Sequence, residues 1–153
     1  MTTIPELFDL TGRAAIVTGG ASGLGQYYAQ ALIGAGADVF VVSRSEKGWQ
    51  ELRQFAAQHG RQVVFMTQDL TAEQAAINVI TEFKKHFESL DILINNAGVQ
   101  IRNDIVSYRD EDWQKVIDIN LNALYYLSHE AAKVMITQKS GKIINIGSMQ
   151  SFR

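Results

Sequence analysis

The sequence predicts an α/β fold, with helices covering both faces of a doubly wound parallel sheet. Short apolar runs alternate with longer amphipathic stretches along the 153 residues, which is the pattern of buried strands joined by crossover helices. A glycine-rich turn follows the first apolar run, and small polar residues end two of the later runs. Because the carboxyl ends of parallel strands meet at one crevice, these features also predict where a ligand binds.

The strands are expected at five short apolar runs, each buried on both faces of the sheet. These runs are Ala14–Val17, Val39–Val42, Val63–Met66, Ile92–Ile94 and Ile143–Ile146. If the strands lie in the spatial order 3-2-1-4-5, the fifth strand, residues 142–146, is left at an edge. An apolar edge exposes hydrogen-bonding groups that invite pairing with another chain. The sequence is therefore expected to be incomplete at its C-terminus or to be completed by a partner.

Helices are expected where apolar residues recur at every third or fourth position. Four stretches have this spacing: Leu24–Ala35, Lys47–His59, Ala72–Phe87 and Glu111–Lys139. At the start of the third stretch, Thr71 and Gln74 have the spacing of a capping box. The fourth is long enough for two consecutive helices, with a break near Asn120.

Composition narrows the range of functions. Apolar residues make up 46% of the chain, enough for the core of one domain over residues 1–153. The net charge of −2 is spread along the sequence, so neither nucleic acid nor a membrane is expected as a partner. With no cysteine and three scattered histidines, no metal site is expected. The sequence contains no signal-like or membrane-spanning segment, so we expect a cytoplasmic protein.

Three glycines, Gly19, Gly23 and Gly25, follow the first expected strand. Glycine permits a sharp turn with positive φ, and it lets a pyrophosphate approach the backbone N–H groups at a helix N-terminus. An ordinary tight turn is the alternative interpretation. The later strand ends, at Asn95-Asn96-Ala97-Gly98 and Asn145-Ile146-Gly147-Ser148, favour a nucleotide site.

In order and spacing, five motifs closely resemble the short-chain dehydrogenase/reductase family. They are Thr18-Gly-x-x-x-Gly-x-Gly25, Asp69-Leu70, Asn95-Asn96-Ala97-Gly98, Asn120-Leu121 and Ile144-Asn145-Ile146-Gly147-Ser148. The resemblance covers the whole chain, but only the first part of the family's usual domain. It implies a Rossmann-type doubly wound sheet, incomplete at the C-terminus, that binds NAD or NADP.

The resemblance assigns most of the candidate cofactor-binding residues. The glycines with Ser22 and Leu24 form the pyrophosphate turn, Asp69 and Leu70 flank the adenine, and the strand end at 96–98 lines the floor. These residues are Gly19, Ser22, Gly23, Leu24, Gly25, Asp69, Leu70, Asn96, Ala97 and Gly98.

The resemblance also implies catalytic roles for two residues. Asn120 matches an asparagine that helps to hold a proton-relay water, and Ser148 matches a serine that hydrogen-bonds the substrate oxygen. The alternatives are a helix break at Asn120 and a turn cap at Ser148. The family's proton donor is a tyrosine followed four positions later by a lysine, and no tyrosine of this sequence has that partner. The chain alone is therefore expected to be inactive.

Within the family, the sequence resembles the bacterial deoxygluconate dehydrogenases in three short segments, at residues 112–113, 141–146 and 148–152. The implied reaction is hydride transfer between a nicotinamide and a hydroxyl or keto group of a deoxy-sugar acid. Arg102 and Arg153 are candidates to bind the substrate carboxylate, with solvated loop positions as the alternative. A non-catalytic dinucleotide-binding or interaction module is the alternative function.

The second expected strand ends in Ser43-Arg44, where an acidic residue would bind the ribose hydroxyls of NAD. Without that carboxylate, Arg44 is free to pair with a 2′-phosphate, so NADP is slightly favoured over NAD. The resemblance further implies a homotetramer that packs through the helix at 121–139. The residues expected at that interface are Ala123, Leu124, Leu127, Ala131, Val134 and Met135.

Overall fold

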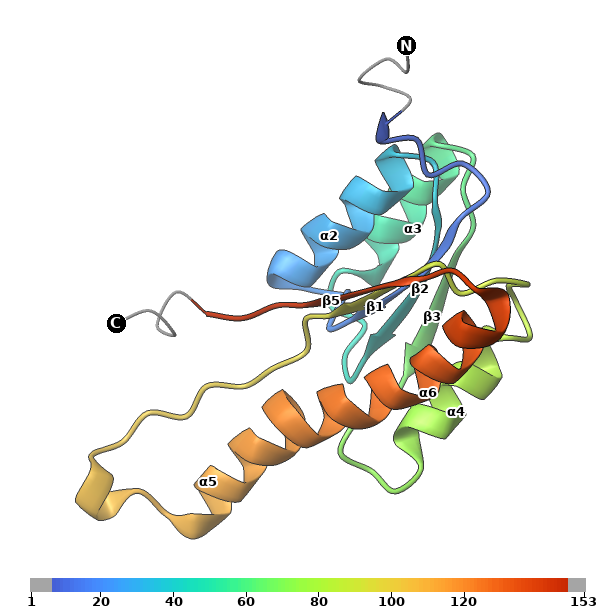
Figure 1. Cartoon of the computed structure of the whole chain (residues 1–153). Coiled ribbons are helices and arrows are strands. Elements are labelled where there is room, and N and C mark those ends of the chain that lie inside the picture. The colour runs from blue at the N-terminus through green and yellow to red at the C-terminus, as the bar shows by residue number, and fades with distance from the viewer. Residues whose placement is uncertain (1–6, 149–153) are drawn as a thin grey trace.

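The computed structural model describes residues 7–148, which form a five-stranded sheet with helices on both faces (Figure 1). The strands are β1 (Ala14–Thr18), β2 (Asp38–Ser43), β3 (Val63–Thr67), β4 (Ile92–Asn95) and β5 (Lys142–Asn145). All neighbouring strands pair in parallel, in the order β3-β2-β1-β4-β5. The predicted doubly wound parallel fold is confirmed, and the strands have the order in which β5 is left at an edge.

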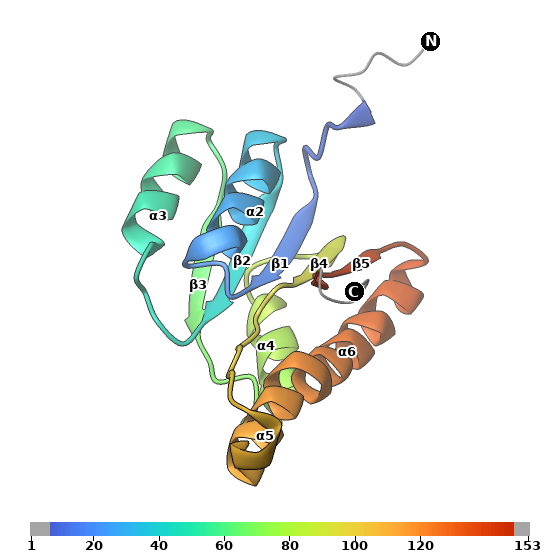
Figure 2. The same ribbon diagram turned by 90° about the vertical axis from the view of Figure 1, so that its left-hand side faces the viewer.

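Alternate residues of the central strands point into two separate hydrophobic layers. Helices α2 (Gly23–Gly34) and α3 (Trp49–Gln58) cover one face, where their apolar side chains pack with Val17 and Val41. Helices α4 (Ala75–Phe83) and α6 (Ala123–Gln138) cover the other, where they pack with Ile16 and Phe40 (Figure 2). The continuous apolar runs of β1 and β2 are therefore explained by burial on both faces.

The edge strand β5 differs from the expectation. All four of its residues are exposed, with Ile143 at 37% and Ile144 at 45% exposure, so the expected burial on both faces is wrong for this strand. Among the described residues β5 pairs only with β4. Its other edge therefore keeps backbone groups available for a further strand.

Helix α5 (Asp110–Ile117), a π-helical turn labelled η2 (Asp118–Asn122) and α6 follow one another without interruption. We call residues 110–138 the rod. The two consecutive helices expected here are therefore present as α5 and α6. The division near Asn120 is a π turn, through which the chain keeps a helical path. Ala123, Leu127, Ala131 and Met135 are buried in the core of this chain, so their expected place at a subunit interface is wrong.

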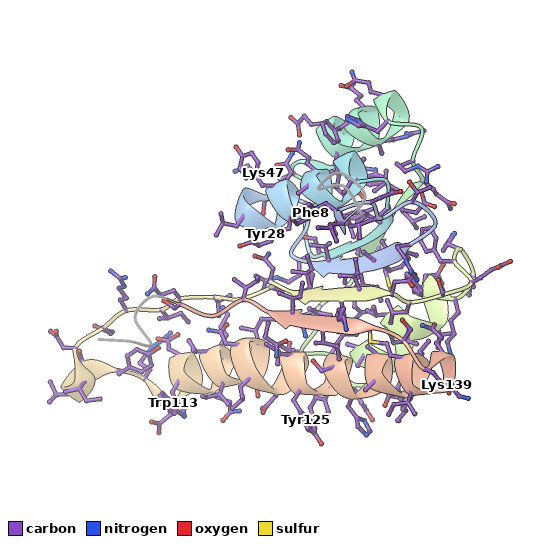
Figure 3. The ribbon with its side chains drawn as sticks, turned by 45° about the horizontal axis from the view of Figure 1, so that its top comes forward. Phe8, Tyr28, Lys47, Trp113, Tyr125 and Lys139 are labelled. Carbon is purple, nitrogen blue, oxygen red and sulfur yellow. The ribbon has the colours of Figure 1, made fainter. Side chains whose placement is uncertain are left out.

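The opposite side of the rod is exposed. Trp113 and Tyr125 lie on the side that faces away from the sheet (Figure 3). Leu121, Tyr126 and Ile136 are also largely exposed. These exposed apolar residues are not among the six expected at an interface. Of those six, Leu124 and Val134 are half-buried, and their place at an interface stays a prediction.

The start of α4 also departs from the sequence pattern. Its N-cap residue, Gln74, has φ 58° and makes no side-chain capping bond. Thr71 donates its hydroxyl hydrogen to Asp69 Oδ1 at 2.8 Å. The predicted capping box is therefore wrong, because Asp69 competes for the Thr71 side chain.

Asp91 joins the amino ends of β1 and β4. Its carboxylate accepts hydrogen bonds from Ala14 N (3.0 Å), Arg13 Nη1 (2.9 Å) and Ser89 Oγ (2.7 Å). Burial alone raises the pKa of Asp91, but these bonds outweigh it and hold the pKa below its ordinary value.

Candidate functional site

The glycine-rich turn connects the carboxyl end of β1 to the first turn of α2. Gly19 and Gly23 have φ of 65° and 54°, in the left-handed region that favours glycine. A Cβ at Gly25 would meet the Gly19 carbonyl oxygen and would lie 2.5 Å from Asn96 Nδ2. The turn can therefore close only without a side chain at this position. This close approach fits the backbone cradle of a dinucleotide site.

Thr18 connects this turn to the end of β4, and sequence reasoning gave it no role in the site. Its buried hydroxyl accepts hydrogen bonds from the backbone N of Asn96 and Ala97, both at 3.0 Å. Asn96 Nδ2 donates to Thr18 O, also at 3.0 Å. A polar residue at the end of an otherwise apolar strand was the available signal, since a buried hydroxyl needs partners.

A cleft of about 450 Å³ opens over these strand ends. Seven of the expected cofactor-binding residues line it: Gly19, Ser22, Ser43, Arg44, Leu70, Ala97 and Gly98. The structure adds five lining residues that the sequence did not indicate: Val42, Ser45, Gln68, Val99 and Ile119. The cleft thus brings together the carboxyl ends of β1, β2, β3 and β4 and one residue of the rod, Ile119.

The other five expected cofactor residues do not line the cleft. Gly25 and Asn96 lie behind the turn, where they set its shape. Gly23 begins α2, Leu24 is 63% exposed, and Asp69 follows β3. Their predicted contact with a cofactor stays a prediction.

Asp69 is held as a carboxylate beside the cleft. Its Oδ1 accepts hydrogen bonds from Thr71 N at 2.9 Å and from Thr71 Oγ1 at 2.8 Å. These bonds, with a smaller contribution from the positive charge of Arg44, lower the pKa of Asp69. The ends of β2 and β3 therefore present opposite charges to each other.

Asn120 fixes the loop that follows β4. Its Oδ1 accepts a hydrogen bond from Val99 N at 2.8 Å, and its Nδ2 donates to Val99 O at 2.9 Å. Gly98 lies so close that a Cβ there would be 3.2 Å from Asn120 Oδ1. The π turn thus places Asn120 against one wall of the cleft. A role in holding a water stays a prediction.

Ser148 follows β5, which leaves the sheet at the same end as β4 (Figure 1). Buried Asn95 organises this end, because its Nδ2 donates to Asn145 Oδ1 and to Ser128 Oγ, both at 2.9 Å. Ile146 N donates to Asn95 O at 3.0 Å. The position of the strand that leads to Ser148 therefore depends on Asn95.

Of the two candidate substrate arginines, the structure describes only Arg102, which is not among the residues that line the cleft. Arg102 is exposed on the loop between β4 and α5. Arg153 lies outside the described residues. Their contact with a substrate carboxylate stays a prediction.

A second hollow, of about 470 Å³, lies between the start of α4 and the rod. Glu73, Asp118 and Glu130 are on its walls, and none of its lining residues is a lysine, arginine or histidine. An anionic cofactor therefore fits the first cleft better. Within residues 7–148 there is no cluster of three potential metal ligands. No helix in that range is both long and apolar enough for a membrane span.

The glycine turn, the Thr18 contacts and the β4 strand end agree with the result of a comparison with protein families. A family model described as short chain dehydrogenase matches residues 13–153. The chain belongs to this family. The resemblance drawn from the sequence motifs is thereby confirmed.

Several members of the short-chain dehydrogenase family are similar over nearly the whole chain. An uncharacterized oxidoreductase of Escherichia coli, YgcW, is 46% identical over 96% of this chain and 56% of its own length. A 2-dehydro-3-deoxy-D-gluconate 5-dehydrogenase of Bacillus subtilis is 38% identical over 97% of this chain and 58% of its own length. The chain thus spans less than two thirds of these relatives.

Solved structures of family members have the same fold. A candidate 2-deoxy-D-gluconate 3-dehydrogenase from Agrobacterium tumefaciens, crystallised with bound NADP, superposes with a TM-score of 0.84 and 36% identity. The match covers 99% of this chain and 58% of that protein.

Proposed function

We propose that this chain forms the NADP-binding part of an oxidoreductase that acts on a hydroxyl or keto group of a deoxy-sugar acid. The close packing of Gly19, Gly25 and Asn96 is the observation that carries the proposal. This packing places glycine backbone, with no side chain in the way, and the N-terminus of α2 at the cleft. The Agrobacterium and Bacillus relatives support the cofactor and the substrate class, respectively.

The preference for NADP over NAD rests on Ser43 and Arg44. Both line the cleft, at and just after the end of β2, where a carboxylate would favour the ribose hydroxyls of NAD. Arg44 supplies a positive charge and planar donors that suit a 2′-phosphate.

The nicotinamide, when bound, supplies or accepts the hydride. In the proposed reaction, Ser148 donates a hydrogen bond to the substrate oxygen and orients it. Asn120 holds Val99 at the cleft wall, and Asn95 holds the end of β5 that leads to Ser148. Because no tyrosine of this chain has a lysine four residues later, we propose that the chain alone does not catalyse the reaction.

The proposed substrate carries a carboxylate, and Arg102 and Arg153 are the cations proposed to bind it. We also propose a homotetramer, in agreement with the exposed apolar side of the rod at Trp113, Tyr125 and Ile136. Light scattering at micromolar concentration measures this directly, and a strict monomer would contradict it.

Binding tests the cofactor proposal in this chain. Isothermal titration should give a Kd for NADP, and Arg44→Ala should weaken NADP about tenfold while changing NAD much less. Equal losses for both cofactors would show that Arg44 does not contact the 2′-phosphate. Arg53→Ala, a surface change on α3, is the matched control.

Catalysis is tested by following reduced-nicotinamide absorbance with 2-deoxy-gluconate and its keto relatives. We expect no turnover from this chain, and turnover from a longer polypeptide that contains the tyrosine and lysine. Turnover by this chain that survives Ser148→Ala would contradict both the proposed inactivity and the role of Ser148. A longer polypeptide that binds NADP without turnover of any alcohol or ketone would favour the non-catalytic module.

A further inference from the structure

The loop between β2 and α3, residues 44–48, is attached to the glycine-rich turn. Gly48 N donates a hydrogen bond to Ala21 O at 2.8 Å, and Gln26 Nε2 donates a longer bond to Gly48 O at 3.5 Å. Gly48 is buried although the four residues before it are exposed. One residue thus anchors an otherwise exposed loop.

Glycine is required at position 48 because there is no room for a side chain, and not because of its backbone conformation. Its φ of −110° and ψ of 15° are accessible to other residues. A Cβ at this position, however, would lie 2.6 Å from Ala21 O and 2.7 Å from Gln26 Oε1. Any side chain at position 48 would therefore push the loop away from the turn.

Ser22, which follows Ala21, lines two hollows. The cofactor cleft has Ser22, Arg44 and Ser45 in its lining. A smaller notch, of about 230 Å³, has Ser22, Lys47 and Gly48 among its lining residues. A hydroxyl group therefore has a cation on the cleft side and another on the notch side.

The loop has internal bonds that keep this arrangement. Ser43 Oγ accepts a hydrogen bond from Ser45 N at 3.4 Å, and Ser45 Oγ accepts one from Lys47 N at 3.2 Å. Lys47 extends from the loop into solvent (Figure 3). Glu51, in the first turn of α3, also lines the notch and opposes the binding of an anion there.

We infer that Gly48 is a positioning residue that fixes Lys47 and Arg44 on either side of Ser22, so that the two cations together select a 2′-phosphorylated cofactor. The inference rests on the proposed NADP site and adds two residues to it. Lys47 supplies the second positive charge. Gly48, which has no side chain, allows the loop that carries Lys47 to lie close to Ala21 in the glycine-rich turn. A phosphate dianion held between two cations and a hydroxyl gains charge-assisted hydrogen bonds that a ribose hydroxyl cannot make.

The test compares 2′,5′-ADP with 5′-AMP by isothermal titration of this chain. The two probes differ only in the 2′-phosphate. Gly48→Ala should weaken 2′,5′-ADP about tenfold and 5′-AMP less than about twofold. Lys47→Ala should weaken 2′,5′-ADP about threefold, because an exposed cation contributes modestly. Glu51→Gln should strengthen it.

Two comparisons separate positioning from general damage. Gly34→Ala is the matched control, since a Cβ there meets nothing within 4 Å, and it should leave both affinities unchanged. In a double-mutant cycle, Lys47→Ala should cost little in the Gly48→Ala background, because the displaced loop has already removed that charge.

Equal weakening of both probes by Gly48→Ala would overturn the inference, since it would mean that Gly48 only supports the glycine turn. An unchanged affinity for 2′,5′-ADP in Lys47→Ala would overturn it as well. If the unsubstituted chain bound neither probe, the proposed nucleotide site would itself be wrong. Binding of 5′-AMP with no gain from the 2′-phosphate would overturn only the selectivity.

Discussion

The two halves of the sheet differ in how far this chain holds them in place. Around β1 and β2, strands lie on both sides, helices cover both faces, and the turn at Gly25 is fixed by Asn96. Around β5, the outer edge is open and Ile144 is exposed. The proposed nucleotide site therefore lies in the half of the sheet that residues 7–148 hold in place more fully.

The strongest test of this comparison is Gly25→Ala. The new Cβ would press on the Gly19 carbonyl and the Asn96 amide, so the turn must open. We expect the affinity for NADP to fall about a hundredfold, equivalent to about 2.7 kcal/mol, as measured by isothermal titration.

Gly147→Ala provides the counterpart in the other half, because a Cβ there meets nothing within 4 Å. Its NADP affinity should equal that of the unsubstituted chain. If both substitutions weakened NADP alike, the two halves would not be independent in cofactor binding.

A second test removes the carboxylate of Asp91, which joins the amino ends of β1 and β4. Asp91→Asn replaces a carboxylate that accepts three hydrogen bonds, and we expect the free energy of unfolding to fall by about 2 kcal/mol in urea titrations near neutral pH.

The pH dependence of this loss has a defined sign. The pKa of Asp91 is lowered in the folded chain, so its contribution is present above the unfolded value of about 3.9 and is lost as the pH falls through the folded pKa. The Asn variant should therefore lose less stability between neutral pH and pH 3. A variant with the same acid dependence as the unsubstituted chain would rule out Asp91 as its source.

The smallest effect on folding is expected at the open edge. Ile144→Lys places a charge on the exposed strand β5, which should reduce self-association in light scattering while changing the free energy of unfolding by less than about 0.5 kcal/mol. Val41→Lys, at a fully buried position of β2, should instead prevent folding. Unchanged association in Ile144→Lys would locate the contact elsewhere.

The sequence was most informative at positions where only one residue type satisfies the structural requirement. Gly19 and Gly25 are explained by positive φ and by close packing, respectively, and the spacing of these glycines after an apolar run is enough to predict the turn. The parallel sheet followed from the alternation of apolar runs with helices. Thr18 and Gly48 could not be assigned in this way, because their partners, at 96–97 and at 21, depend on the tertiary fold.

The errors lie in places where competing arrangements have similar local patterns. Apolar Ile143 and Ile144 predict burial, yet a strand with a single neighbour leaves them exposed. Small residues such as Ala123 and Ala131 suit a helix packed on another subunit as well as one packed on its own sheet, and the structure has the second arrangement. A π turn has no distinct signature in periodicity, so the sequence predicts a division between two helices near Asn120 but not that a π turn joins them.

The pairing of Asn120 with Val99 has a consequence for how this site can vary. Asn120 uses one donor and one acceptor to bind the backbone of Val99, as a neighbouring peptide unit would, so the pairing is indifferent to the side chain at position 99. Any residue except proline, which lacks the N–H, preserves it. Val99 also lines the cleft. A substitution at position 99 can therefore change the shape of the cleft wall while the loop keeps its backbone path. This holds only as long as the side-chain amide of Asn120 is retained.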